Sequence, residues 1–180
     1  MLWNKSLNLD KLNGVDIVII STVPFFLVNQ LSSHIYNLKD KGMRVTLVTS
    51  AGEELQEFLN DDSIQVITIE IPRKIEPWAD LKALVLIVKL FSMHKFTIMH
   101  STTPKAGLLC AIAAKITGIP VRLHTFTGQV WATKTGLMKS LLQFLDKIIV
   151  QLNTHCYVDS PSQREFLINS GIAKKKALST

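Results

Sequence analysis

Segments with a strand-like pattern alternate with segments of helical period along the whole chain, and no other feature of the sequence constrains the fold as strongly. The first is an unbroken, mostly β-branched run from Asp16 to Ile20, typical of a strand covered on both faces. Further strands are expected over residues 44–49, 65–69, 96–100, 121–125 and 156–158. Short connections between strands and helices favour a parallel sheet with right-handed crossovers. The sequence therefore predicts an α/β fold, a Rossmann-like three-layer domain.

Proline and glycine residues mark the ends of the predicted helices. One helix is expected to begin at Pro24 and to be closed by Gly42, and others are expected over residues 53–59, 77–94, 104–118, 136–152 and 161–171. Trp78 is expected to pack against the start of its helix. The helix that begins at Gly136 is expected to bury a set of apolar side chains: Leu137, Leu141, Leu142, Leu145, Ile148, Ile149 and Leu152.

The length of 180 residues suits one domain, at about 150 residues per domain. We expect an N-terminal extension over residues 1–15, the Rossmann-like domain over 16–173, and a truncated linker without a strand of its own over 174–180. The longest apolar stretch, residues 81–91, contains two lysines and is too short to span a membrane. The first 16 residues lack the apolar region of a signal peptide. Cys110 and Cys156 are expected to be buried, reduced thiols.

The charge of the chain narrows the classes of partner. Twenty Lys and Arg residues against 14 Asp and Glu residues give a net charge of +6, which suits nucleic acid, an anionic membrane face or a phosphorylated substrate. No stripe of basic and aromatic residues indicates nucleic acid. No glycine-rich nucleotide motif and no cysteine pair with metal-ligand spacing occurs, so no cofactor and no metal is expected. His34, His94 and His155 are predicted to lie away from the ligand-binding edge.

Ligands of open parallel sheets bind beyond the carboxyl ends of the strands, and two loops there carry suitable chemistry. In residues 100–105, Thr103 precedes a helix N-terminus and Lys105 adds a charge, which suits a phosphate or a sugar hydroxyl. The alternative is that Thr103 only caps the helix and Lys105 is solvated. In residues 123–131, hydroxyl, amide and aromatic groups favour a carbohydrate. The alternative there is a core histidine at His124 and a loop anchor at Trp131.

Three segments together resemble the N-terminal half of family 4 glycosyltransferases: residues 96–109, 121–131 and 159–164. Residues 22–27 and 71–73 also fit the bacterial branch that builds lipid-linked surface polysaccharide or glycan precursors. The resemblance covers about residues 15–173, although the glycine pair that many members have after the first strand is absent. It implies one half of a GT-B architecture, the half that mainly holds the acceptor. The half that holds the nucleotide-sugar is expected to be absent from this chain.

The resemblance also implies roles for residues in a retaining transfer that needs no metal. His124 matches the family histidine that reaches the donor sugar near the reaction centre, where a neutral imidazole would steady developing charge. Acceptor or substrate binding is assigned to ten residues: Thr22, Pro24, Phe25, His100, Thr103, Lys105, Thr127, Gly128, Gln129 and Trp131. The implied acceptor is a polyprenyl-diphosphate-linked sugar. The expected location is cytoplasmic and peripheral on the anionic inner face of the cell membrane, and the apolar helix that begins at Pro77 suits either that contact or ordinary core packing.

Two other classes of function stay open. One is a non-catalytic or split-enzyme subunit, which binds the acceptor or a separate donor-binding chain. The other is an unrelated flavodoxin-like binding module. An exposed apolar cleft near His124 would favour the subunit. A phosphate site in the loop after the first strand would favour the binding module, against which residues 23–26, Val-Pro-Phe-Phe, argue.

Overall fold

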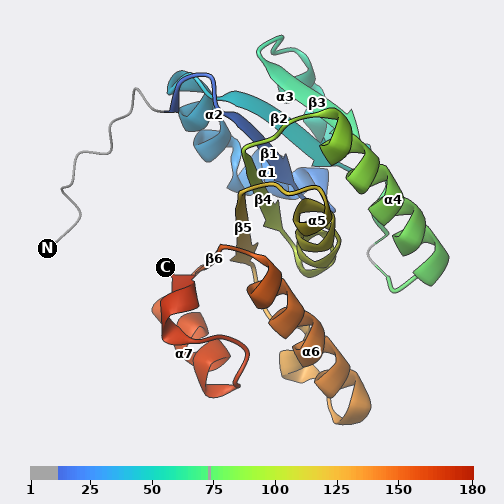
Figure 1. The fold of residues 1–180 in the computed structure, drawn as a ribbon, viewed down its shortest axis with the longest axis vertical. Helices are drawn as coiled ribbons and strands as arrows, with labels where there is room; N and C mark the ends of the chain where they lie inside the picture. The colour runs from blue at the N-terminus through green and yellow to red at the C-terminus, as the bar shows by residue number, and fades with distance from the viewer. Residues whose placement is uncertain (1–11, 73) are drawn as a thin grey trace, which may run out of the picture.

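The computed structural model describes residues 12–72 and 74–180 and contains one parallel sheet in the order β3-β2-β1-β4-β5-β6-β7 (Figure 1). All neighbouring strands are parallel, which confirms the predicted Rossmann-like α/β fold. The strands are β1 (Asp16–Ile20), β2 (Arg44–Thr49), β3 (Ile64–Thr68), β4 (Ile98–Thr102), β5 (Val121–Phe126), β6 (His155–Val158) and β7 (Leu178–Ser179).

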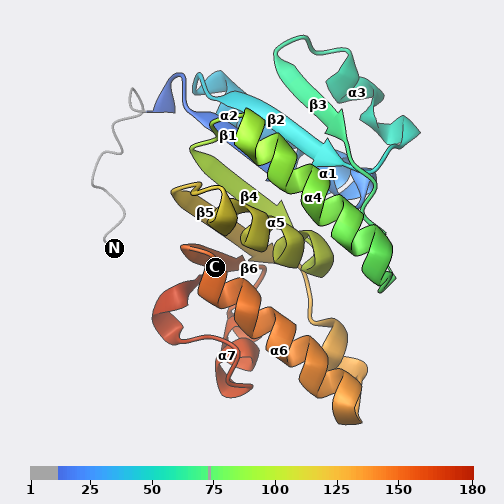
Figure 2. The same ribbon diagram turned by 45° about the vertical axis from the view of Figure 1, so that its right-hand side comes forward.

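The helices lie on both faces of the sheet. They are α1 (Pro24–Gln30), α2 (Ser32–Asp40), α3 (Gln56–Leu59), α4 (Pro77–Met93), α5 (Pro104–Ile116), α6 (Gly136–Leu152) and α7 (Pro161–Asn169), with 3-10 turns η2 (Glu53–Leu55), η3 (Val130–Thr133) and η4 (Lys175–Ala177). Helices α2 and α3 bury their apolar side chains against one face of β1 and β2, and α4 and α5 against the other face. Figure 2 shows α4, α5 and α6 side by side in one layer, with α5 in the middle.

Helix α5 approaches the sheet closely because its buried side is built from alanine and glycine. Ala106, Cys110 and Ala113 are fully buried in the core shared with α4. A methyl group added at Gly107 would lie 2.4 Å from Cε1 of His124 on β5. Only glycine therefore fits at the point where the first turn of α5 crosses β5.

Two predicted elements differ from the structure. The predicted helix from Pro24 is divided at Leu31, whose backbone (φ −115°, ψ −5°) leaves helical geometry and separates α1 from α2. Strand β4 begins at Ile98, where its pairing with β1 starts, and not at Phe96. Phe96 lies before the strand and packs edge-on against Phe91, with ring centroids 5.9 Å apart. Phe96 is therefore apolar because it is buried in the loop before β4, and not because it belongs to the strand.

Two residues of the predicted linker over 174–180 form a strand of the sheet. Lys175–Ala177 form η4, and the next two residues form β7, with Leu178 opposite Cys156 on β6. Arg164 on α7 holds this segment by donating hydrogen bonds to the carbonyl oxygens of Leu178 (3.1 Å) and Lys175 (2.8 Å). The prediction that these residues lack a strand is wrong, because a two-residue strand is too short to show a period in the sequence.

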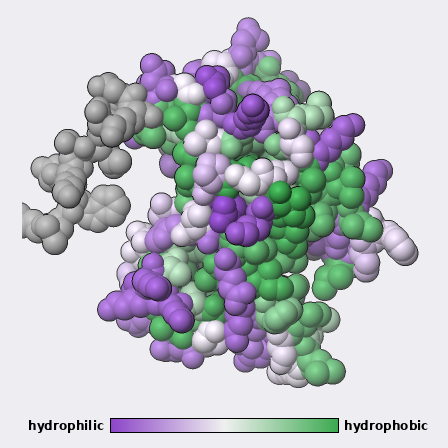
Figure 3. All heavy atoms as spheres, in the orientation of Figure 1, coloured by the Kyte–Doolittle hydropathy of each residue, from purple (hydrophilic) through white to green (hydrophobic). Residues whose placement is uncertain are grey.

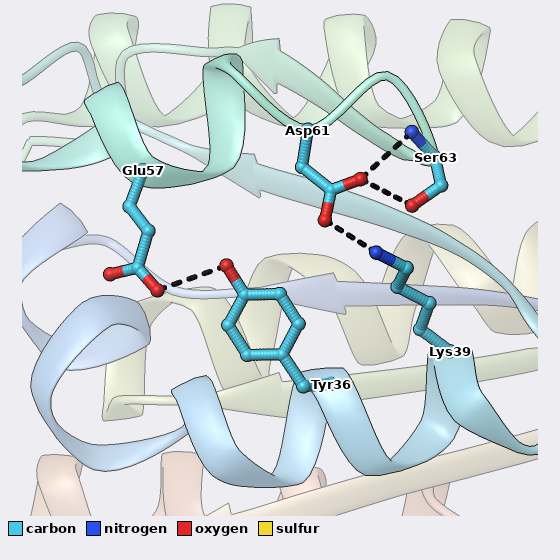
Figure 4. Close-up of polar contacts among 5 residues, drawn as sticks. All are labelled: Tyr36, Lys39, Glu57, Asp61 and Ser63. Carbon is cyan, nitrogen blue, oxygen red and sulfur yellow. Dashed lines mark hydrogen bonds and ion pairs between the residues drawn. The ribbon is translucent and has the colours of Figure 1, made fainter.

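A polar clasp joins α2 to the segment before β3 (Figure 4). Tyr36 donates a hydrogen bond to Glu57 at 2.9 Å, and the Lys39 ammonium lies 2.5 Å from the Asp61 carboxylate. The hydrogen bond from Lys39, followed by those from Ser63, lowers the pKa of Asp61 to about 2. The Asp61 carboxylate of the clasp is therefore ionised at neutral pH.

Two further expectations are met in the described residues. Cys110 and Cys156 are both free and buried, as predicted, and burial raises the pKa of the Cys156 thiol to about 12. Over residues 12–72 and 74–180, no helix is long and apolar enough to span a membrane.

Candidate functional site

Successive strands are added to one side of the sheet after β1 and to the other side after β4, so the strand order reverses between β1 and β4. From β1 the chain proceeds to β2 and β3 on one side, and from β4 it proceeds to β5, β6 and β7 on the other. The loops after β1 and β4 therefore diverge to opposite faces, which leaves a crevice at their carboxyl ends. Such a switch point is where open parallel sheets bind their ligands.

Thr22 and Thr103 meet at this switch point. The backbone N–H and the hydroxyl of Thr22 both donate to Oγ1 of Thr103, at 3.4 Å and 3.1 Å. A hydroxyl has two acceptor positions and one hydrogen to donate. Within the described residues no acceptor for the Thr103 hydrogen is found. Both acceptor positions are used inside the protein, so the remaining donor can serve a ligand.

Thr103 has an unusual backbone conformation. Its φ of +66° is the one positive value at a non-glycine residue in the described part of the chain. The residue occupies the N-cap of α5, but its side chain makes no capping hydrogen bond and faces Thr22 instead. Thr103 is therefore at the predicted N-cap position, but its side chain does not cap the helix. Such strain costs about 1–3 kcal/mol and is typical of functional sites.

Lys105 does not present a free charge at the helix N-terminus. Its ammonium lies 2.7 Å from the Asp80 carboxylate and also donates to the carbonyl oxygen of Lys74. The ion pair is mostly buried and ties the first turn of α5 to the first turn of α4. An anion at Lys105 would have to displace Asp80, so the structure does not support the predicted binding role.

His124 is enclosed, with 1% of its surface exposed. Its Nδ1 lies 3.0 Å from Oγ of Ser101, and its ring packs edge-on against Phe126 under Gly107. Burial lowers the pKa of His124 to about 3, so the imidazole is neutral. A neutral ring agrees with the sequence analysis. Direct contact with a sugar does not fit this structure, because the ring has no open side.

His100 lies on the opposite face of the sheet from His124. Consecutive residues of a strand point to opposite faces, and Ser101, next to His100, is the residue that reaches His124. Nε2 of His100 lies 2.8 Å from Oγ1 of Thr125, and burial lowers the pKa of His100 to about 4. Among the residues described, no three histidine, cysteine or acidic side chains gather as metal ligands.

Trp131 anchors its loop and does not face a ligand. Its indole N–H donates to Asp146 on α6 at 2.7 Å, its ring stacks on Phe166 of α7 at 5.0 Å, and 2% of its surface is exposed. The prediction that Trp131 contacts a sugar is wrong, because an indole ring enclosed between two helices cannot cover one. The loop-anchor alternative is confirmed.

The rest of this loop lies beside the switch point, at the carboxyl end of β5. Thr127 and Gln129 are half-buried and Gly128 is exposed. The Gln163 amide donates to the carbonyl oxygen of Phe126 at 3.1 Å and contacts Oε1 of Gln129 at 3.5 Å. Gln163 is not among the predicted site residues. Its spacing from Ser160 is that of a capping box, which indicates a helix start next to the carboxyl end of a strand.

The remaining predicted residues lie in α1. Phe25 is 54% exposed in the first turn of that helix, three residues after Thr22, whereas Pro24 is buried. The structure thus brings Thr22 and Thr103 together at the switch point, and the exposed ring of Phe25 lies in the helix that begins just after Thr22. Pro24 shapes the start of α1 and does not present a surface to a ligand.

Comparison with known proteins identifies the family. Residues 29–178 match the glycosyl transferase 4-like domain. The chain belongs to this family. The match runs from the last two residues of α1 into β7 and includes Thr103 and both loops, whereas β1 and Thr22 lie before it.

Curated relatives of this glycosyl transferase 4-like chain are glycosyltransferases. The chain is 36% identical to the capsular polysaccharide biosynthesis glycosyltransferase CapM of Staphylococcus aureus over 141 residues, an alignment that covers 78% of the chain and 36% of CapM. The chain is 28% identical to an Escherichia coli UDP-Gal:alpha-D-GlcNAc-diphosphoundecaprenol alpha-1,3-galactosyltransferase over 119 residues, an alignment that covers 65% of the chain and 30% of that enzyme. The chain therefore spans about a third of the length of these relatives.

The fold agrees with the family. A glycosyltransferase from Rickettsia africae superposes with a TM-score of 0.73 at 17% identity, over 93% of this chain and 42% of that protein. At this identity the likeness shows the fold, which is the Rossmann-like half-fold of GT-B glycosyltransferases. The predicted resemblance to family 4 glycosyltransferases is thereby confirmed.

Proposed function

We propose that the chain is the acceptor-binding half of a retaining glycosyltransferase. Its acceptor is a polyprenyl-diphosphate-linked sugar in surface polysaccharide or glycan biosynthesis. The Escherichia coli relative, whose acceptor is a diphosphoundecaprenol-linked sugar, supports this acceptor class. The observation that carries the proposal is the pair Thr22 and Thr103 at the switch point, with one hydroxyl hydrogen left to donate.

The site recognises a sugar by hydroxyl groups and a helix terminus. The Thr103 hydroxyl donates to an acceptor oxygen while Thr22 fixes its orientation. The free N–H groups at the start of α5 add positive potential for a phosphate, whereas Lys105 is neutralised by Asp80. Phe25 offers an exposed ring that can cover the apolar face of a sugar.

His124 contributes to this proposed site as a positioning residue. It holds Ser101, two residues before Thr103, and it fixes the approach of α5 through Gly107. The nucleotide-sugar is a substrate in this proposal, and a donor-binding part outside these 180 residues holds it. No cofactor or metal takes part.

Binding of a water-soluble acceptor tests the proposal. The probe is N-acetylglucosamine joined through a diphosphate to a short alkyl chain, titrated calorimetrically into the 180-residue chain. We expect saturable binding that Thr103→Ala weakens about tenfold, the loss of one hydrogen bond to a charged or polar ligand, and that Thr103→Ser retains. Thr97→Ala, at the opposite edge of the sheet beside Asp16, is the matched control. Absence of binding, or equal binding by Thr103→Ala, would contradict the proposal.

We also propose that the chain works on the anionic inner face of the cell membrane, where a lipid-linked acceptor is held. The net charge of +6 supports this location.

A further inference from the structure

Helix α6 exposes three apolar side chains, of which Leu137 and Leu141 are predicted from the sequence to be buried. Leu137 is 90% exposed and Phe144 59%, and Leu141 between them is also exposed. The three are spaced at i, i+4 and i+7 and lie on one side of the helix, which we call the α6 stripe. The opposite side of α6 supplies the buried residues Ile149 and Asp146. The period was predicted correctly, but part of the apolar surface faces away from the core.

Helix α4 carries a second exposed stripe. Trp78 is 84% exposed, and Leu81 and Val85 are more than half exposed at i+3 and i+7 from it. We call these three residues the α4 stripe. The expectation that Trp78 packs against the helix start is wrong, because the core contacts of α4 come from Ala83, Ile87 and other residues on its far side.

The two stripes belong to one side of the molecule. Helix α5 packs between α4 and α6, and both stripes lie in the first halves of their helices, at the carboxyl edge that holds Thr22 and Thr103 (Figure 2). Hydrophobic side chains gather on the side where these helices lie (Figure 3). Exposed apolar surface of this extent marks an interaction site.

Lysines border the stripes, and most nearby acids are neutralised. Exposed Lys82 lies in α4, one turn after Trp78, and exposed Lys134 lies just before the start of α6. Asp146 is buried against Trp131, and Asp80 is paired with Lys105. Glu76 remains exposed at the α4 start. Apolar residues with a lysine border suit an anionic lipid surface. A second copy of the chain suits them less, because a two-fold interface would bring the lysines together.

We propose that the α4 and α6 stripes together dock on an anionic lipid bilayer. Their apolar side chains enter the interfacial region and their lysines meet the headgroups. Docking in this orientation holds the carboxyl edge, and with it Thr103, next to the lipid surface. The inference rests on the proposed function for its acceptor, but docking itself requires no acceptor.

Vesicle flotation of the 180-residue chain tests the docking. We expect binding to vesicles of phosphatidylethanolamine with phosphatidylglycerol, and much weaker binding to phosphatidylcholine alone. Leu137→Ser and Phe144→Ser are each expected to lower the partition coefficient about tenfold, from the loss of a membrane-buried apolar side chain. Lys82→Gln lowers it about fivefold on anionic vesicles only. Leu59→Ser, a half-exposed leucine on α3, is the matched control and leaves binding unchanged.

Tryptophan fluorescence reports on α4 separately. In the Trp3→Phe variant the remaining indoles are Trp78, which is exposed, and Trp131, which is enclosed. Brominated anionic lipid is therefore expected to quench Trp78, and Trp78→Phe in the same background removes the quenching.

Three results would overturn the docking. They are absence of vesicle binding, vesicle binding that both α6 serine variants retain, and a dimer in sedimentation velocity that these variants disperse while vesicle binding is unaffected. Calorimetry with the short-chain acceptor contains no vesicles. Loss of docking with acceptor binding retained would therefore reject this inference and leave the proposed function standing.

Discussion

Thr103 combines a strained backbone with the hydroxyl that we assign to the acceptor, and two substitutions separate these properties. Thr103→Gly and Thr103→Ala both lose the hydrogen bonds from Thr22, but only glycine relieves the strain of about 1–3 kcal/mol, at a cost of about 0.5–1 kcal/mol in unfolded-state entropy. We expect Thr103→Gly to be more stable than Thr103→Ala by about 1 kcal/mol in urea denaturation, and both variants to bind the short-chain acceptor about tenfold more weakly than the natural chain. Thr97→Gly, which has no positive φ to relieve, should be less stable than Thr97→Ala. A Thr103→Gly variant less stable than Thr103→Ala would show that the φ is not strained.

Asp146 makes the stability of the fold depend on pH. Burial raises its pKa from 3.8 to about 6, so the folded chain holds a proton there that the unfolded chain has released. Its stabilising contribution is present below about pH 4 and is lost as the pH rises through about 6. Asp146→Asn keeps an oxygen for the Trp131 N–H and should flatten this part of the stability profile. Denaturation at pH values on both sides of 6 measures it, and an unchanged slope would contradict the assignment.

At the residue scale, chemical type could be predicted but burial could not. His124 and Trp131 have the side chains that sugar sites use, yet one is enclosed under Gly107 and the other between two helices. Thr22 and Thr103 are 81 residues apart in sequence, and their contact follows from the pairing of β1 with β4. The contact cannot be predicted from the sequence unless the order of the strands in the sheet is known.

At the scale of elements, the approach of α5 to β5 depends on Gly107. A Cβ at this position would clash with the His124 ring at 2.4 Å, so Gly107→Ala should destabilise the chain by about 1–3 kcal/mol. Truncating the ring should relieve the clash, and Gly107→Ala combined with His124→Ala should cost less than the sum of the two single variants. A double-mutant cycle by urea denaturation measures this coupling. Additive costs would mean that helix and ring do not press on each other.

Element positions were predicted best where a strand is buried on both faces. Strands β1 and β2 begin and end where the β-branched runs do. The helices after proline, α4 and α5, also begin as predicted. The sequence does not show which part of an apolar helix is covered, since a core contact and a docking surface have the same period. The α6 stripe was therefore assigned to the core.

At the scale of the whole molecule, the chain corresponds to 36% of the length of CapM. We expect the 180-residue chain alone to show no sugar transfer from any nucleotide-sugar, because our proposal assigns it only the acceptor. The measurement is incubation with labelled nucleotide-sugars and the short-chain acceptor, followed by product separation. Turnover by the purified chain would contradict the division of roles.

The hydrogen bonds between Thr22 and Thr103 also join two segments that lead to the apolar layers on opposite faces of the sheet. The segment after β1 leads to the core of α2 and α3, and the segment after β4 leads to the core of α4 and α5. A ligand bound at the Thr22–Thr103 contact would touch the start of both segments. The bound ligand would hold the two segments together. Ligand binding would therefore slow the local unfolding of helices on both faces of the sheet.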